Sequence, residues 1–150
     1  MSALDQFDSD YSDYWRSATS VTADAGGPPS PETVFSTVAK LLTPGKSLTS
    51  GLDVACGHGR LAGVMSQICQ VFDGVEIESS ACSLARAHAY RQVFESPIET
   101  FSPRAQYDFI LCWAAYEVLD QQKSLLRMNQ LLATSGLAVL TGKNANYLET

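Results

Sequence analysis

Short apolar runs alternate with segments of helical periodicity along this chain, and that alternation constrains the fold more than any other feature. The runs have the length and composition of strands and lie at residues 51–56, 71–77, 107–113 and 137–140, with a weaker one at 92–94. Between them, apolar residues recur at the spacing of one helix face. Strands separated by helices pair in parallel through right-handed crossovers. We therefore predict an α/β fold, a doubly wound and mostly parallel sheet of about five strands with helices on both faces.

Capping residues and apolar stripes predict four helices. Ser30 and Pro31 mark the start of the first, because serine caps helix N-termini and proline fits the first turn, and Thr43-Pro44-Gly45 ends it. The apolar stripes are Val34, Phe35, Val38, Leu41 and Leu42; Leu61, Val64, Met65 and Ile68; Ala81, Leu84, Ala85 and His88; and Leu125, Leu126, Met128, Leu131 and Leu132. Ser135-Gly136 closes the last helix. On this pattern, His88 is expected to pack against the core and not to act as a base.

Length, composition and charge limit the class of protein. A chain of 150 residues, 45% hydrophobic and 17% charged, is expected to form one globular domain at residues 30–150 after an acidic, aromatic lead segment at residues 1–29. The formal net charge is -6, and no cluster of Lys and Arg favours a nucleic acid or an anionic membrane as partner. No apolar run has the length of a membrane span, and the acidic N-terminus is unlike a signal peptide. We therefore expect a cytoplasmic protein.

The chain has four cysteines, and none of them forms a C-x-x-C pair. They are Cys56, Cys69, Cys82 and Cys112. Disulfide scaffolds are denser in cysteine, and zinc sites need closely spaced pairs of ligands. Cys56 and His58 could form one such pair, but His88 is the only other histidine of the chain. Buried free thiols are therefore expected, with no metal site.

A glycine-rich turn, Gly57-His58-Gly59, follows the first predicted strand and precedes a helix. Glycines let a ligand approach the backbone closely, and the start of the helix offers free N–H groups. Glu76 ends the next strand, 19 residues after Gly57, where an acid can accept hydrogen bonds from both hydroxyls of a ribose. The pattern predicts a site for an adenosine-containing cofactor.

Two classes of cofactor fit this turn, and Asp53 distinguishes them. Residues 57–62 satisfy the dinucleotide pattern G-x-G-x-x-A, which favours a nicotinamide or flavin cofactor and an oxidoreductase. A carboxylate at the end of the first strand is unfavourable beside a pyrophosphate but favourable beside an ammonium and a sulfonium, as in S-adenosylmethionine. Two structural interpretations stay open: Asp53 could cap the turn, and Glu76 could be a solvated carboxylate at a strand end.

Several segments in order resemble the motifs of class I S-adenosylmethionine-dependent methyltransferases. Residues 52–60 (LDVACGHGR) resemble the first motif, with Ala55 in place of its first glycine, and residues 74–77 (GVEI) are similar to the second. Residues 107–113 (YDFILCW) resemble the fourth strand, and residues 131–137 resemble the turn before the fifth. The resemblance covers about residues 31–143. It implies a Rossmann-like fold that binds S-adenosyl-L-methionine.

The resemblance also implies roles for individual residues. Asp53 would lie near the methionine ammonium, and Glu76 would bind the ribose. Gly57 and Gly59 would allow close approach to the methionine and ribose, while Ile77 and Ile98 would flank the adenine. Pro97 stands where many relatives have an acid that contacts the adenine amino group. The predicted cofactor-binding residues are Asp53, Ala55, Gly57, His58, Gly59, Glu76, Ile77, Ile98, Trp113 and Tyr14.

Some of these residues have a second interpretation. His58 either touches the ligand or is an exposed loop residue. Tyr14, together with Tyr11 and Trp15, either forms an aromatic lid over the cofactor or packs against the domain.

The segment after the fourth predicted strand would face the methyl acceptor. Trp113, Tyr116 and Glu117 lie there, and Glu117 or Tyr116 is the candidate base if the acceptor must lose a proton. The sequence (D/N)-P-P-(Y/F) of many amino-methylating DNA and protein enzymes is absent, since residues 112–115 read CWAA. We therefore expect a small-molecule acceptor, methylated by in-line displacement.

The C-terminal end of the chain leaves open whether the methyltransferase-like domain is complete and catalytic. Class I methyltransferases usually continue past the fifth strand, whereas this chain stops at Thr150 and would leave residues 137–140 as an apolar edge strand. We expect a truncated or shortened relative. The alternatives are a domain completed by a partner or by self-association, and a noncatalytic domain that binds S-adenosylmethionine.

Overall fold

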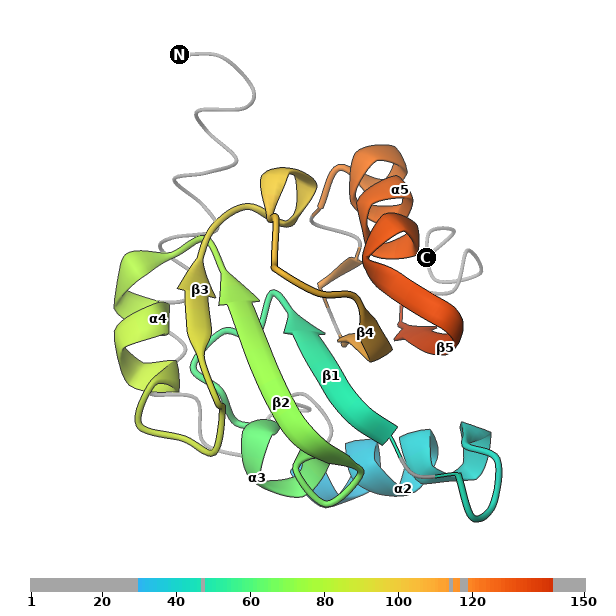
Figure 1. Cartoon of the computed structure of the whole chain (residues 1–150). Coiled ribbons are helices and arrows are strands. Elements are labelled where there is room, and N and C mark those ends of the chain that lie inside the picture. The colour runs from blue at the N-terminus through green and yellow to red at the C-terminus, as the bar shows by residue number, and fades with distance from the viewer. Residues whose placement is uncertain (1–29, 47, 114, 117–118, 142–150) are drawn as a thin grey trace, which may run out of the picture.

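A five-stranded sheet organises the computed structural model, which describes residues 30–46, 48–113, 115–116 and 119–141 (Figure 1). Its strands are β1 (Leu48–Val54), β2 (Cys69–Glu76), β3 (Val93–Glu95), β4 (Tyr107–Cys112) and β5 (Leu132–Leu140). Their order across the sheet is β3-β2-β1-β4-β5, and every neighbouring pair is parallel. The predicted fold class is therefore confirmed. The lead segment at residues 1–29 lies outside the described residues.

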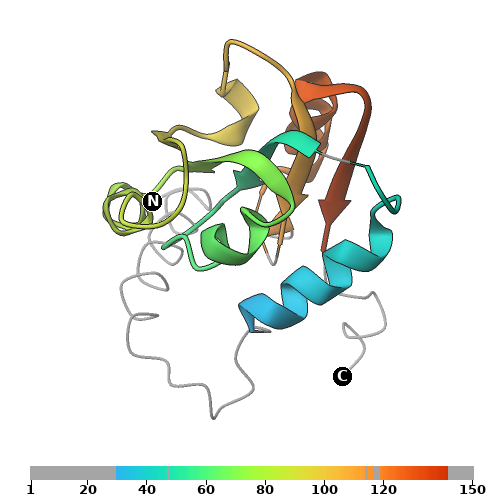
Figure 2. The same cartoon turned by 60° about the horizontal axis from the view of Figure 1, so that its bottom comes forward.

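Helices cover both faces of the sheet. They are α2 (Pro31–Leu41), α3 (Ala62–Met65), α4 (Ser79–Ala85), the short 3-10 helix η3 (Ile98–Thr100) and α5 (Gln121–Leu131). Figure 2 shows α2 and α3 on one side of the sheet, with η3 and α5 on the other. Each helix follows a strand and leads to the next parallel strand, except α2, which precedes β1. This is the doubly wound arrangement expected from the alternating sequence pattern.

Two apolar layers form the core, one on each face of the sheet. The layer beneath α2 and α3 contains Val34, Val38, Met65, Phe72 and Phe109, and the layer beneath α5 contains Leu52, Val54, Ile110, Met128 and Leu131. The central strand β1 contributes Leu52 and Val54 to the layer beneath α5 and Leu48, its first residue, to the layer beneath α2 and α3. The sheet is thus buried on both sides at β1, where the glycine-rich turn begins.

Helix α2 begins where its capping residues predict. The backbone N–H of Thr33 donates to Ser30 Oγ at 3.2 Å, and Pro31 occupies the first turn. Helix α5 is capped in the same way, since the N–H of Lys123 donates to Asp120 Oδ1 at 3.1 Å. Side-chain oxygens at these positions satisfy N–H groups that have no partner inside the helix.

Two predicted helices are shorter than their apolar stripes suggested. Helix α3 has only four residues, because β2 already begins at Cys69. Helix α4 ends at Ala85, and the chain then turns back so that the Arg91 N–H donates to Phe72 O of β2 at 2.8 Å. The prediction for His88 is therefore wrong: it lies beyond the helix and is exposed.

Several leucines that the apolar stripes predicted to face the core are exposed. Leu41, Leu84, Leu125 and Leu126 are exposed to between 47% and 59%. In α5, the buried residues are Ser124, Met128 and Leu131, which share a face at helical spacing. The apolar residues of that stripe spread around too wide an arc for all of them to reach the sheet.

Strand β5 begins earlier than predicted. It starts at Leu132, directly after α5, and its pairing with β4 shifts register before Leu137. Residues 137–140 then pair with residues 109–112 of β4, as the apolar run predicts. The prediction that Ser135-Gly136 closes the last helix is therefore wrong, because α5 ends at Leu131 and pairing with β4 begins at Leu132. Ser135 has a positive φ of 63° and forms an irregularity within the strand. Strand β5 forms one edge of the described sheet.

All four cysteines are buried thiols outside any disulfide bond, as predicted. Burial raises the pKa of Cys69 to about 12 and that of Cys82 to about 11, so these thiols remain protonated at neutral pH. Within the described ranges, no group of three or more His, Cys, Asp or Glu side chains could hold a metal ion. No helix in that part of the chain is long and apolar enough to span a membrane.

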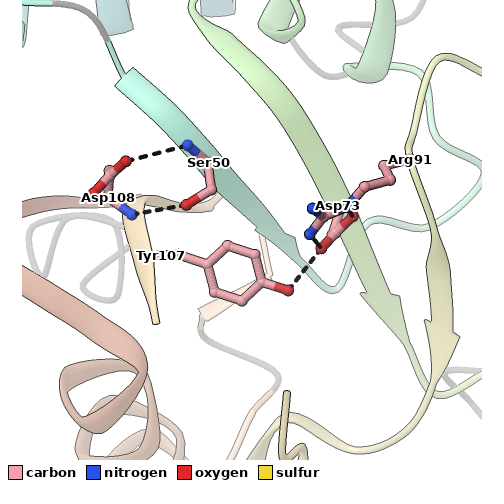
Figure 3. A network of polar contacts seen from close by, with 5 residues as sticks. All are labelled: Ser50, Asp73, Arg91, Tyr107 and Asp108. Atoms are coloured by element: carbon pink, nitrogen blue, oxygen red, sulfur yellow. Dashed lines mark hydrogen bonds and ion pairs between the residues drawn. The ribbon is translucent and has the colours of Figure 1, made fainter. Parts of the chain in front are cut away.

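A polar network connects β1, β2 and β4 (Figure 3). Arg91 donates to both carboxylate oxygens of the buried Asp73, at 3.0 and 2.6 Å, and Tyr107 Oη donates to Asp73 Oδ2 at 2.8 Å. Asp108 Oδ2 accepts from the N–H groups of Thr49 and Ser50 at the start of β1. These contacts link β2 to β4 and to the segment before β3, and they link β4 to the start of β1.

Candidate cofactor site

After the carboxyl end of β1, three residues in or just before the glycine-rich turn have left-handed backbone conformations. Ala55, Gly57 and Gly59 have φ values of 55°, 56° and 86°. A Cβ atom on Gly59 would lie 2.9 Å from Cε2 of Tyr90 and 3.0 Å from the backbone Cα of Ala85. Gly59 is therefore required both by its φ and by the close approach of α4. Ala55, at the position of the first motif's first glycine, adopts the same region with a side chain.

Glu76 ends β2 beside this turn, and its side chain is buried, with 1% exposure. Its Oε2 accepts from the Gly57 N–H at 2.9 Å, and its Oε1 accepts from the N–H groups of Ile77 and Glu78 at 2.9 and 3.0 Å. Glu76 is thus not a solvated strand-end carboxylate. A carboxylate oxygen usually accepts two hydrogen bonds, so Oε2 keeps capacity for one more donor.

Asp53 lies on β1, one residue before its end, and is 2% exposed. Tyr90 Oη donates to Asp53 Oδ2 at 2.6 Å. In the described part of the chain, its hydrogen-bond partner is this hydroxyl and not a backbone N–H of the turn, which contradicts the capping interpretation. Burial raises the pKa of Asp53 to about 7; the charge of Glu76 also raises it, whereas the Tyr90 hydrogen bond and the charge of Arg60 lower it.

Tyr90 is the site residue that the sequence patterns did not reveal. It lies between α4 and β3, and its ring stacks on Phe72 with centroids 5.7 Å apart. Burial is the main cause that raises the pKa of its hydroxyl, so Tyr90 acts as a donor to Asp53. Its separation from Asp53 by 37 residues matches no local motif. The two side chains meet because β2 pairs with β1 on one side and with the segment before β3 on the other.

The two isoleucines predicted to flank the adenine have different environments. Ile77 is 56% exposed directly after β2, so its side chain is accessible to a ligand. Ile98 in η3 is 4% exposed and packs in the core layer beneath α5. Ile77 can therefore contact a ligand, whereas most of the Ile98 side chain already packs against the core.

The remaining predicted residues lie around the carboxyl ends of β1 and β4. His58 and Trp113 are half-buried, and the ring of Trp113 packs beside the layer beneath α2. Tyr116 is half-buried, and its hydroxyl donates to the Gln121 carbonyl at 3.4 Å. Glu117 and Tyr14, with Tyr11 and Trp15, lie outside the described residues.

The site combines a left-handed turn with two buried carboxylates on adjacent strands. Val54 and Val75 are paired in the β1–β2 ladder, so Asp53 and Glu76 lie at the same end of the sheet. A crevice at the carboxyl ends of parallel strands is where such sheets bind nucleotide-type ligands. The fold and the site together define a Rossmann-like domain for an adenosine-containing cofactor.

The comparison with known families agrees with the motifs. A family described as "Methyltransferase domain" matches residues 30–149. The chain therefore belongs to the methyltransferase-domain family, which confirms the family predicted from the sequence.

Individual relatives are similar at lower identity. The chain is 28% identical over 102 residues to a ubiquinone biosynthesis O-methyltransferase of Bradyrhizobium diazoefficiens, covering 64% of this chain and 40% of that protein. The N-methyltransferase NodS of Bradyrhizobium japonicum, solved with S-adenosylhomocysteine, has a TM-score of 0.64 at 17% identity, covering 74% of this chain and 61% of NodS. The amino pentose methyltransferase CalS10 of Micromonospora echinaspora, solved with S-adenosylmethionine, has a TM-score of 0.62 at 22% identity. The match covers 73% of this chain and 48% of CalS10.

The chain spans less than two thirds of the length of each of these relatives. At these identities the solved structures establish a shared fold. They have the Rossmann-like methyltransferase architecture that the β3-β2-β1-β4-β5 order of this sheet matches.

Proposed function

We propose that this domain binds S-adenosyl-L-methionine and serves the transfer of its methyl group to a small-molecule acceptor. The observation that carries the proposal is the pair of buried carboxylates, Asp53 and Glu76, at the ends of β1 and β2 beside the glycine-rich turn. The ligand carries an ammonium and a sulfonium, and ionised carboxylates attract both groups in a site of low dielectric. Membership of the methyltransferase-domain family supports the same cofactor.

The two carboxylates have separate roles in this proposal. Asp53 attracts the methionine ammonium. Glu76 already accepts three backbone N–H groups, so it offers Oε2 to one ribose hydroxyl and cannot take two hydroxyls without losing a present contact. Gly57 and Gly59 let the backbone approach the ligand, and the exposed side chain of Ile77 covers one side of the adenine.

The same charges disfavour the alternative of a dinucleotide cofactor. A pyrophosphate at this turn would lie near two buried carboxylates, and their repulsion would be weakly screened because both are away from solvent. The sequence match to G-x-G-x-x-A therefore identifies the turn geometry and not the ligand.

When bound, S-adenosylmethionine supplies a methyl group already activated by the sulfonium. The chain's own contribution is to hold ligand and acceptor in line and to exclude water. Trp113 and Tyr116 follow β4 and would line the acceptor side, with Tyr116 or Glu117 as the base where the acceptor must lose a proton. The Tyr116 hydroxyl donates to the Gln121 carbonyl, so it would have to leave that contact to act.

The class of acceptor is proposed from charge and from relatives. The net charge of -6 disfavours a nucleic acid or an anionic membrane as partner. The location that belongs to this proposal is the cytoplasm. Ubiquinone biosynthesis and an amino pentose, in the names of two similar proteins, both indicate small molecules.

Calorimetric titration of the purified chain with S-adenosylmethionine, S-adenosylhomocysteine and NAD tests the proposal. We expect the first two to bind and NAD to give no heat. Glu76→Ala should weaken binding by about tenfold or more, because it removes a hydrogen bond to a charged acceptor worth roughly 1.5–3 kcal/mol.

Glu95→Ala is the matched control, since Glu95 pairs with Glu76 across β2 and β3 but is exposed. This variant should bind like the parent. Binding of NAD alone, or unchanged affinity in a folded Glu76→Ala variant, would contradict the assignment.

A further inference from the structure

Tyr90 is held under the glycine-rich turn by an extension of the sheet. The N–H of Arg91 donates to Phe72 O at 2.8 Å, and the N–H of Gly74 donates to Gln92 O at 2.9 Å. Successive residues of an extended segment point to opposite faces. Tyr90 therefore points towards Asp53 and α4, while Arg91 points to the other face and pairs with Asp73 (Figure 3).

The Tyr90 ring fills space that two glycines leave open. A Cβ atom on Gly59 would lie 2.9 Å from Tyr90 Cε2, and one on Gly74 would lie 3.4 Å from Tyr90 Cε1. The ring stacks on Phe72 on its other side. This packing leaves the hydroxyl at 2.6 Å from Asp53 Oδ2, within the range of a hydrogen bond to a charged carboxylate.

We propose that Tyr90 is a positioning residue of the cofactor site, whose hydroxyl holds the Asp53 carboxylate in the orientation that a cationic ligand needs. This inference rests on the proposed binding of S-adenosylmethionine. The hydroxyl occupies Oδ2 and so leaves Oδ1 for the ligand ammonium. Tyr90 itself touches neither the ammonium nor the reacting atoms in this proposal.

The groups around Asp53 make its charge sensitive to this one hydrogen bond. In the described part of the chain, Tyr90 faces it from the segment before β3, Glu76 from β2, and Arg60 and the Cys56 thiol from the turn. Burial raises the pKa of Asp53 to about 7, and Tyr90 is the strongest opposing influence. Neutral Asp53 offers no charge to an ammonium, so ligand affinity should rise with pH up to this value and then level off.

Removing the Tyr90 hydroxyl should shift that rise to higher pH. Tyr90→Phe keeps the ring against Gly59 and Phe72 but deletes the donor, so the pKa of Asp53 increases further. Each unit of increase weakens binding about tenfold at pH values below both pKa values and leaves it unchanged well above them. A residue with a purely structural role would weaken binding equally at every pH.

The experiment is calorimetric titration of the full chain with S-adenosylhomocysteine from about pH 5.5 to about pH 8.5. The parent is compared with Tyr90→Phe and with Tyr107→Phe, which deletes an equivalent hydroxyl from the buried Asp73 on the opposite face. Titration of the ligand amine is common to all variants and cancels in their comparison. We expect Tyr90→Phe to lose about tenfold in affinity near pH 6 and to converge with the parent at high pH, while Tyr107→Phe follows the parent.

Three outcomes would overturn the inference. A Tyr90→Phe profile that superimposes on the parent, or that lies below it by a constant factor, assigns Tyr90 no influence on the charge of Asp53. A parent that gives no heat at any pH refutes the proposed function itself, and the inference with it. If circular dichroism shows Tyr90→Phe to be unfolded, Asp53→Asn decides: its affinity should be independent of pH beyond the ligand's own titration, and a rise like the parent's would refute the role of Asp53.

Discussion

At the scale of single residues, Asp53 and Glu76 show how two carboxylates with similar burial come to have different surroundings. Glu76 accepts three backbone N–H groups, whereas Asp53 accepts one hydroxyl hydrogen bond. The carboxylate of Asp53 therefore loses most of its hydration and gains little in return, which is why its pKa rises to about 7. Such an acid is costly to keep charged unless a cation is bound beside it.

This cost gives a prediction about stability and pH. The pKa of Asp53 in the folded chain lies above its ordinary value of 3.8, so the unfolded chain loses this proton first as pH rises. The resulting penalty is absent at low pH, grows between about pH 4 and about pH 7, and then stays constant. Asp53→Asn should therefore raise the free energy of unfolding at about pH 8 by roughly 2 to 4 kcal/mol and change it little near pH 4.

Urea unfolding of the parent and of Asp53→Asn across this pH range checks the prediction. The control is Asp120→Asn at the exposed cap of α5, where asparagine also caps. The Lys123 N–H lowers the pKa of Asp120, so any pH dependence of this variant has the opposite sign to that of Asp53→Asn. A stability difference between Asp53→Asn and the parent that is the same at every pH would mean that Asp53 stays charged throughout.

At the scale of elements, the turn between β1 and α3 depends on backbone conformations that most residues avoid. Gly59 combines a φ of 86° with contact to both α4 and Tyr90. Gly63, four residues further and exposed within α3, has no positive φ, and a Cβ atom there would meet nothing within 4 Å. The same substitution at these two glycines should therefore have opposite effects.

Gly59→Ala should destabilise the chain by about 2 to 4 kcal/mol, the combined cost of a left-handed residue and of overpacking against Ala85. Gly63→Ala should be neutral or stabilising by up to about 1 kcal/mol, because alanine favours a helix over glycine. Thermal unfolding followed by circular dichroism measures both. A Gly59→Ala variant as stable as the parent would show that the turn does not require glycine at position 59.

At the scale of the whole molecule, the polar network on Asp73 connects parts of the sheet that apolar contacts alone would leave free to shift. Asp73 is 1% exposed on β2, and its partners come from the segment before β3 and from the start of β4. Its strongest contact is with Arg91, and the hydrogen bonds to Asp73 raise the pKa of that guanidinium further. The network therefore links β2, β4 and the segment before β3 on the face opposite Tyr90.

Asp73→Ala should destabilise the chain by about 2 to 4 kcal/mol, because the buried Tyr107 hydroxyl and the Arg91 guanidinium both lose their acceptor. This range allows for the 52% exposure of the Arg91 side chain, which lets water take part of the lost contact. Chemical denaturation measures the effect. Lys123→Ala removes a solvent-exposed ion pair with Asp120 and should cost much less; a similar loss in both variants would deny the network its structural role.

Local sequence patterns were sufficient to predict the boundaries of elements that depend on neighbouring residues in the chain. Ser30 and Pro31 predict the start of α2 because capping involves neighbouring residues, and the apolar run at residues 107–113 predicts β4 within one residue. The ends of α3 and α4 could not be predicted in this way. Their apolar stripes continue, but pairing of the next strand with the sheet stops each helix, and that pairing involves residues distant in sequence.

Residue type and spacing along the chain are sufficient to predict the alternation of strands and helices, the glycine-rich turn, and Asp53 and Glu76 as candidate site residues. What those carboxylates contact depends on the three-dimensional fold. Glu76 meets the N–H of Gly57 because β2 lies beside β1, and Asp53 meets Tyr90 because the chain turns back after α4 to extend the sheet. Burial and hydrogen bonding depend on neighbours in space, and those neighbours, not the motif, set the charge that the site presents to its ligand.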